Sequence, residues 1–116
     1  MGVSSRFAPG TETLVLEVFG SFDFPTCKAC LRAWRKGGAS RPRRLVIDMR
    51  RAESIDSSAL GLILFLQDKA AAASAELEVA NCPRPIEEMM QIAGLQTRVR
   101  ITALQGPDNH RRSSSE

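Results

Sequence analysis

Three consecutive polar side chains separate a short β-rich run from a long apolar segment. They are Asp56, Ser57 and Ser58, which follow the run 45–49 and a charged connector and precede the apolar segment 59–66. Asp and Ser are favoured N-cap residues, so the cluster predicts the start of a helix, in which one residue caps and the others are solvated. Because the first amide groups of a helix lack partners and carry about half a positive charge, two hydroxyls and a carboxylate would stand at a terminus that attracts anions.

Nucleophilic catalysis by one of these serines would need a base within hydrogen-bond reach. The only histidine, His110, lies in a polar tail, and neither serine stands in a G-x-S-x-G elbow. The sequence has no glycine-rich phosphate loop, dinucleotide fingerprint or metal-ligand cluster. Glu87 and Glu88 are adjacent on a predicted helix and face different directions, which is typical of a charged surface. We therefore expect no enzymatic activity, no cofactor and no metal.

The cysteines offer a competing hypothesis. Cys27 and Cys30 form a C-x-x-C pair, which would suit redox chemistry or half of a zinc site. However, Cys27, Cys30, Leu31 and Trp34 stand at i, i+3, i+4 and i+7, the apolar stripe of one helix face. With Cys82 the count is odd and no secretion signal is present, so a disulfide framework is not expected. We interpret the cysteines as buried packing residues and keep a small redox or metal protein as the alternative.

The charge of the chain is mild, at +3 from 16 basic and 13 acidic residues. Five arginines gather between positions 41 and 51, so a nucleic-acid interface has to be weighed. Such an interface would interleave aromatic residues with the basic face, but aromatics are only 5% of the chain and none lies in that segment. We interpret the arginines as a solvated rim around a strand and expect no nucleic-acid partner.

Length and composition fit one soluble domain. The chain has 116 residues, 43% of them hydrophobic, and its longest apolar run is far below the ~18 residues needed to cross a bilayer. Residues 1–10 carry neither a hydrophobic signal region nor a twin-arginine signal. We expect a cytoplasmic protein without membrane insertion, with a domain over 1–105 and a polar mobile tail over 106–116.

The first half of the chain predicts a strand followed by an amphipathic helix. Alternation over 13–19 indicates a strand that Gly20 closes, and an edge strand is expected before it. A helix is expected over about 27–36, with Thr26 as its N-cap or Asp23 as the alternative cap. Two glycines at 37 and 38 are expected to stop it.

The second half predicts further alternation of strands and helices. Residues 44–49 contain consecutive apolar side chains, as in a central strand covered on both faces, and the Ala-rich exit after 59–66 favours a long helix. The remaining elements are a strand over 76–80, a helix over about 86–93 stopped by Gly94, and a short strand around 99–101. This order predicts an α/β fold with helices packed on a mixed sheet.

Four segments together resemble a known family. The run 54–63, SIDSSALGLI, resembles the signature of the STAS domain, in particular that of bacterial anti-sigma-factor antagonists, whose loop reads Asp-Ser-Ser/Thr-Gly-Leu-Gly. The loop 20–23 with Thr26, the strand 45–49 and the helix 85–95 resemble three further elements of that family in the same order. The resemblance covers about residues 12–102 and implies a single STAS-like domain, a small mixed β-sheet with helices packed on it.

The resemblance also implies a function. In antagonists of this family the serine directly after the aspartate, here Ser57, is phosphorylated by a partner that is both a serine kinase and an anti-sigma factor, and a serine phosphatase reverses the modification. The unphosphorylated protein binds the kinase, and the phosphorylated protein releases it. The positions that would then contact the partner are Phe22, Asp23, Phe24, Asp56, Ser58, Ala59 and Leu60.

Two departures from the family pattern bear on this implication. Ala59 replaces the usual glycine and stiffens the turn, whereas Phe22 and Phe24 flank Asp23 where the family often has polar residues, which favours a hydrophobic partner. The alternative is a constitutive STAS subunit of a cytoplasmic complex, such as a lipid ABC transporter, that uses the same surface without phosphorylation.

Overall fold

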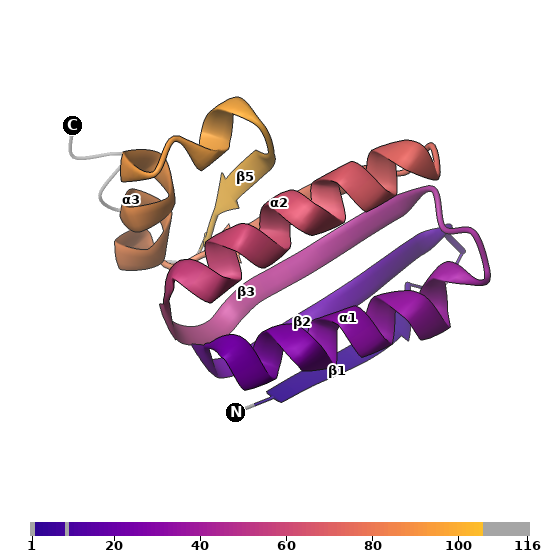
Figure 1. Cartoon of the computed structure of the whole chain (residues 1–116), viewed down its shortest axis with the longest axis horizontal. Helices are drawn as coiled ribbons and strands as arrows, with labels where there is room; N and C mark the ends of the chain where they lie inside the picture. Colours follow the sequence, from indigo (N-terminus) through magenta and orange to yellow (C-terminus); the bar gives the residue numbers. More distant parts are fainter. Residues whose placement is uncertain (1, 9, 106–116) are drawn as a thin grey trace.

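The computed structural model describes residues 2–8 and 10–105, so the tail predicted over 106–116 lies outside the described residues. Two strands, β1 and β2, come first, and from β2 onwards strands alternate with helices (Figure 1). The elements are β1 (Gly2–Phe7), β2 (Thr13–Phe22), α1 (Phe24–Gly38), β3 (Arg44–Ile55), α2 (Ser57–Ala72), β4 (Glu76–Cys82), α3 (Arg84–Ile92), the 3-10 helix η1 (Leu95–Thr97) and β5 (Arg100–Ala103).

The strands form one five-stranded sheet in the order β1-β2-β3-β4-β5. β1 pairs with β2 in the antiparallel direction, while the pairs β2–β3, β3–β4 and β4–β5 are parallel. Each parallel connection contains a helix, as parallel strands require. The predicted α/β class with a mixed sheet is therefore confirmed.

The core lies between the sheet and the two long helices, which run side by side across one face of the sheet (Figure 1). Leu14, Leu16 and Val18 alternate inward along β2 as predicted, and Leu45 and Ile47 do the same on β3. Val46 points to the opposite face and is only half-buried. The prediction that both faces of β3 are covered is therefore wrong for this second face. Among the described residues no helix is long and apolar enough to span a membrane.

Two elements, β2 and α1, extend past the glycines that were predicted to end them. Gly20 does not close β2, because its φ of +71° accommodates an irregularity in the pairing with β3 and the strand continues to Phe22. Gly37 and Gly38 form the last turn of α1 rather than ending it before them. A side chain at Gly37 would meet Leu14 Cδ2 at 2.7 Å, so this glycine lets the helix end approach the sheet. By contrast, Gly94 with φ +76° does end the α3 region as predicted.

Candidate functional site

The carboxyl ends of β2 and β3 bring two helix N-termini together. Phe22 and Ile55 are register partners at the ends of these parallel strands, and the Asp56 amide donates to the Phe22 carbonyl oxygen at 3.4 Å. Asp23 and Asp56 follow those strand ends directly. Asp23 and Asp56, which are 33 positions apart in the sequence, therefore lie at the same edge of the molecule. The N-termini of α1 and α2, with their partial positive charge, both lie at this edge.

Asp23, rather than Thr26, caps α1. Its Oδ1 accepts a hydrogen bond from the Thr26 amide at 3.2 Å, and Pro25 lies in the first turn, where its missing N–H costs nothing. The buried Thr26 hydroxyl lies 3.0 Å from both the Ser21 carbonyl oxygen and Asp23 Oδ1. Thr26 therefore fixes the loop between β2 and α1, while the alternative cap that the sequence left open is the observed one.

Asp56 caps α2 in the same way. Its Oδ1 accepts hydrogen bonds from the amides of Ser58 at 2.9 Å and Ala59 at 3.3 Å. The helix begins at Ser57, within the cluster that predicts its start, because the cap satisfies amides of its first turn. The cluster thus divides into one capping carboxylate and two hydroxyls.

The two serines differ in exposure. Ser57 is exposed on the first turn of α2, whereas Ser58 is half-buried. Within the part of the chain that the structure describes, no hydrogen bond from the Ser57 hydroxyl is found. Ser57 therefore presents a free hydroxyl to solvent at the positive end of a helix.

Two of the predicted contact residues face the core instead. Phe22 is 0% exposed because β2 continues past Gly20 and directs this side chain inward, and Ala59 is 0% exposed on the buried face of α2. Neither side chain is available to a partner, which corrects the prediction for these two positions. Phe24 is 62% exposed, Leu60 is half-buried, and the remaining predicted positions Asp23, Asp56 and Ser58 reach the surface at least in part.

The cysteines are core residues, as predicted. All three are free and buried, with Cys27 and Cys30 on the inner face of α1. Burial, followed by the negative charges of Asp56 and then Asp23, raises the pKa of Cys27 to about 11, and burial raises that of Cys30 to about 12. A thiol that stays protonated at neutral pH is a poor nucleophile and metal ligand. Among the described residues no cluster of three metal-ligating side chains occurs.

These thiols predict a loss of stability in alkali. Thiols of the unfolded chain ionise near pH 9, while Cys27, with a pKa of about 11, stays protonated in the folded chain. The unfolded state therefore binds fewer protons between pH 9 and pH 11, and the free energy of unfolding falls as the pH rises through this window. Urea titrations at several pH values measure it, and Cys27→Ala should make the fall between pH 9 and pH 11 shallower. An unchanged slope in that variant would contradict the assignment.

The cap at Asp56 gives a second prediction. Asp56→Ala removes the acceptor of two amide hydrogen bonds and should lower the free energy of unfolding by about 1 kcal/mol. Asp56→Asn is the matched control, because asparagine caps about as well and removes only the charge. Denaturant titration of both variants measures the free energy of unfolding. An equal loss of stability in the two variants would mean that the charge of Asp56, and not its hydrogen bonds to the amides, stabilises the helix.

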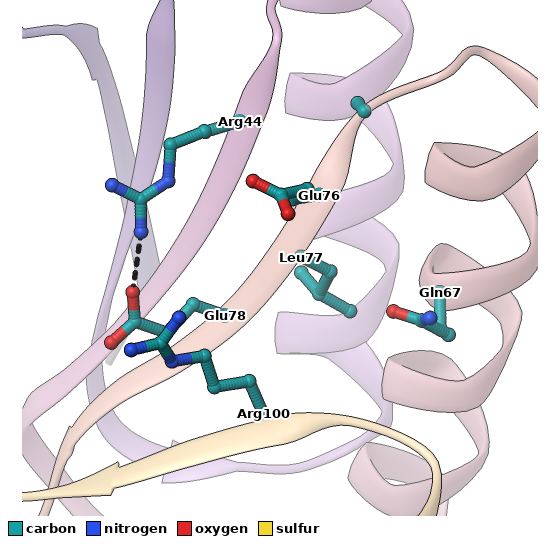
Figure 2. A pocket seen from close by; sticks show the side chains of 7 residues that line it. Arg44, Gln67, Glu76, Leu77, Glu78 and Arg100 are labelled. Carbon is teal, nitrogen blue, oxygen red and sulfur yellow. Dashed lines mark hydrogen bonds and ion pairs between the residues drawn. The ribbon is translucent and has the colours of Figure 1, made fainter.

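A polar pocket lies at the opposite end of the parallel strands. Arg44, Glu78 and Arg100 contribute charged side chains to it from three neighbouring strands (Figure 2). Glu78 is already bound there, since its carboxylate pairs with Arg44 at 2.6 Å and accepts from the Thr102 hydroxyl at 2.9 Å. We interpret the charged side chains of this pocket as a pair that links neighbouring strands and stabilises the sheet.

The sequence did not single out the outer face of α2. Gly61 and Phe65 follow Ser57 at intervals of four residues and are exposed like it. Because residues four apart lie on the same helix face, the three form one stripe. The sequence did not reveal this stripe because α2 is apolar on nearly all sides. In such a helix, hydrophobic periodicity does not indicate which side faces solvent.

The strands and helices form one α/β domain in which the N-termini of α1 and α2 adjoin at one edge of a mixed sheet. The chain belongs to the STAS domain family: the family model described as "Mlab, STAS domain" matches residues 5–105. A STAS-domain containing protein of Pseudomonas aeruginosa (strain UCBPP-PA14) is 30% identical over 102 residues, which cover 88% of this chain and 100% of the relative.

Solved structures show the same fold at low sequence identity. An anti-sigma factor antagonist from Mycobacterium paratuberculosis is 19% identical with a TM-score of 0.73, covering 98% of this chain and 95% of that one. The Bacillus protein SpoIIAA is 16% identical in both its forms. Its unphosphorylated form has a TM-score of 0.65, covering 97% of this chain and 96% of that one, and its phosphorylated form has 0.66, covering 97% and 98%. The chain therefore shares the fold of anti-sigma factor antagonists.

Proposed function

We propose that this chain is a phosphorylation-switched protein-binding module that resembles an anti-sigma-factor antagonist. In its unphosphorylated form it binds a partner that is both a serine kinase and an anti-sigma factor, and phosphorylation of Ser57 by that kinase releases it. A serine phosphatase restores the binding form. The observation that carries the proposal is the exposed Ser57 hydroxyl at the N-terminus of α2.

Electrostatics support a switch at this position. A phosphate adds about −1.5 to −2 charges, which a helix N-terminus tolerates, so the fold should survive the modification. Asp56 and Asp23 follow adjoining strand ends, and the negative charges of both carboxylates contribute to the raised pKa of the Cys27 thiol. A phosphate beside these charges would be costly to desolvate in an interface. Binding would be lost without unfolding.

The surroundings of Ser57 support a protein partner rather than a small ligand. Phe24 is exposed at the start of α1, and the Lys28 ammonium lies 5.6 Å from the centre of its ring. Exposed aromatic side chains are enriched at protein interfaces because they bury a large area with little loss of conformational entropy. Phe24 beside Asp23 is therefore a candidate anchor for the partner.

The family match favours a second candidate function. The matching model is described as Mlab rather than as an antagonist family, and Ala59 takes the place of the signature glycine. On this alternative the chain is a constitutive STAS subunit of a cytoplasmic complex, such as a lipid ABC transporter, and Ser57 is never modified. The same surface would then stay bound to one partner.

Intact-mass measurement on protein taken from its native cell tests the two candidates. A fraction heavier by one phosphate, mapped to Ser57, together with co-purification of a serine kinase, is the result expected for the switch. Co-purification with a transporter ATPase and no phosphate on Ser57 would favour the constitutive subunit.

A further inference from the structure

The strand β1 forms one edge of the sheet, and within the described residues only its inner side is paired (Figure 1). It pairs with β2 in an unbroken register from Gly2 to Phe7. The strand at the other edge, β5, has only four residues and an irregular register with β4. Edge strands are usually short or interrupted by proline or a bulge, because an open edge can pair with another chain. β1 contains neither proline nor a bulge, and its one charged residue is Arg6.

The register shows which main-chain groups of β1 point away from β2. The Ala8 amide donates to the Thr13 carbonyl oxygen at 3.0 Å, which makes these two residues a hydrogen-bonded pair. Hydrogen-bonded and non-hydrogen-bonded pairs alternate along antiparallel strands, so the even-numbered residues of β1 direct their amide and carbonyl groups to β2. The outward-facing amides and carbonyls therefore belong to Val3, Ser5 and Phe7.

The side chains of these three residues point to the face of the sheet that the helices cover. They lie opposite core residues of β2, and residues directly opposite each other share a face. Val3 packs against the core, whereas Phe7 is 42% exposed. On this face the free edge therefore carries an apolar residue toward each end and a serine in the middle.

The other face of the sheet carries unpaired charges close to the same edge. Arg6 is exposed, and Glu17, which lies opposite Ser4, is half-buried. Neither side chain takes part in an ion pair within the described part of the chain. Glu17 also lies opposite Asp48 of β3, so two carboxylates are neighbours across the strands. A positive charge beside Glu17 would be favourable.

We propose that β1 pairs in the antiparallel direction with β1 of a second copy of this chain, about a two-fold axis at Ser5. This register pairs every outward-facing residue: Ser5 with its own copy, and Val3 with the second copy's Phe7. Each such pair exchanges two main-chain hydrogen bonds. An axis at Ser4 or Arg6 would leave Phe7 or Val3 without one of these partners.

The same register matches side chains on both faces. On the helix-covered face the exposed Phe7 ring lies beside the second copy's Val3, an aromatic and β-branched pair of the kind that stabilises paired strands. On the other face Arg6 lies opposite the second copy's Ser4, and the next residue across is that copy's Glu17. Arg6 can reach over the small serine to this carboxylate. Two-fold symmetry repeats each contact, and this charge complementarity favours a second copy over a strand of another protein.

Sedimentation equilibrium of the full chain over a range of concentrations tests the pairing. A pair of six-residue strands buries less area than a standard interface, so we expect a reversible dimer with a Kd on the order of 100 µM. The mass should rise from 12.7 kDa toward twice that value. Ser5→Pro removes an outward-facing amide that the pairing with β2 does not use, and it should raise Kd about 10-fold or more.

Charge reversal tests the register of the pairing. Arg6→Glu sets a glutamate beside the second copy's Glu17, and Glu17→Arg brings two arginines together, so each change should raise Kd about 10-fold or more. The double variant restores opposite charges and should dimerise like the wild-type chain. Arg100→Glu is the matched control, because Arg100 is exposed on the opposite edge strand, and should leave Kd unchanged.

A thermal melt of each variant separates these effects from misfolding. Where Ser5→Pro fails to fold, the charge reversals decide, and a double variant that does not recover dimerisation would overturn the proposal. A wild-type chain that stays at 12.7 kDa at every concentration would also overturn it and leave the edge to a strand of another protein. A dimer that all these variants leave intact would mean that the copies meet elsewhere. None of these outcomes depends on Ser57, so the proposed function is tested separately.

Discussion

Replacing Ser57 with aspartate is expected to weaken binding of the kinase partner by about 100-fold or more, equivalent to about 2.7 kcal/mol. The new carboxylate stands directly after Asp56 at the exposed start of α2, so an interface that covers it must desolvate two adjacent negative charges. The melting temperature should not fall, because a negative charge at a helix N-terminus is favourable. Calorimetric titration and a thermal melt of the same preparation measure the two effects.

Two controls make this result specific. Ser57→Ala should bind as tightly as the wild-type chain and never release the partner, since it lacks the hydroxyl. Ser74→Asp introduces the same charge at an exposed serine just beyond the other end of α2 and should leave Kd unchanged. If Ser57→Asp binds as well as Ser57→Ala, charge at this position does not control binding and the switch is wrong.

Phe22 and Phe24 should respond to substitution in opposite ways, although only Asp23 separates them. Phe22→Ala removes a fully buried aromatic ring and should cost about 3–5 kcal/mol of the free energy of unfolding. Phe24→Ala removes a ring that is 62% exposed and should change stability by no more than about 0.5 kcal/mol. Urea titration of both variants measures this difference.

Partner binding should reverse the order of the two phenylalanines. Under conditions where both variants are folded, Phe24→Ala should weaken binding more than Phe22→Ala, because only Phe24 reaches the surface beside Asp23. A stable Phe22→Ala variant that fails to bind would show instead that both rings contact the partner, as the sequence had suggested.

The strands and caps could be predicted because they depend on local chemistry. The inward alternation of Leu14, Leu16 and Val18 follows from the two-residue period of a strand, and Asp56 caps α2 because aspartate satisfies the first free amides. The choice between Asp23 and Thr26 was open, since both are capping types. The hydrogen bond from the Thr26 amide to Asp23 decides it.

The burial of Phe22 could not be inferred once the strand was ended at Gly20. The same alternation that buries Val18 also buries Phe22 when β2 continues, and it continues because β3 is long enough to pair as far as Ile55. That length is a property of the sheet rather than of the residues around Gly20. The orientation of α2 is likewise set by the sheet, which covers Ala59 and Ile63 and leaves Gly61 and Phe65 outside.

In the proposed function, one hydroxyl, free at the positive end of α2, decides whether a partner protein stays bound. The most direct test titrates the purified partner into two samples of the wild-type chain, one unphosphorylated and one phosphorylated on Ser57, with a thermal melt of each. We predict tight binding only for the unphosphorylated sample, cooperative melting of both, and recovery of binding after phosphatase treatment. Equal affinity of the two samples, or a phosphorylated sample that is unfolded, would contradict the account.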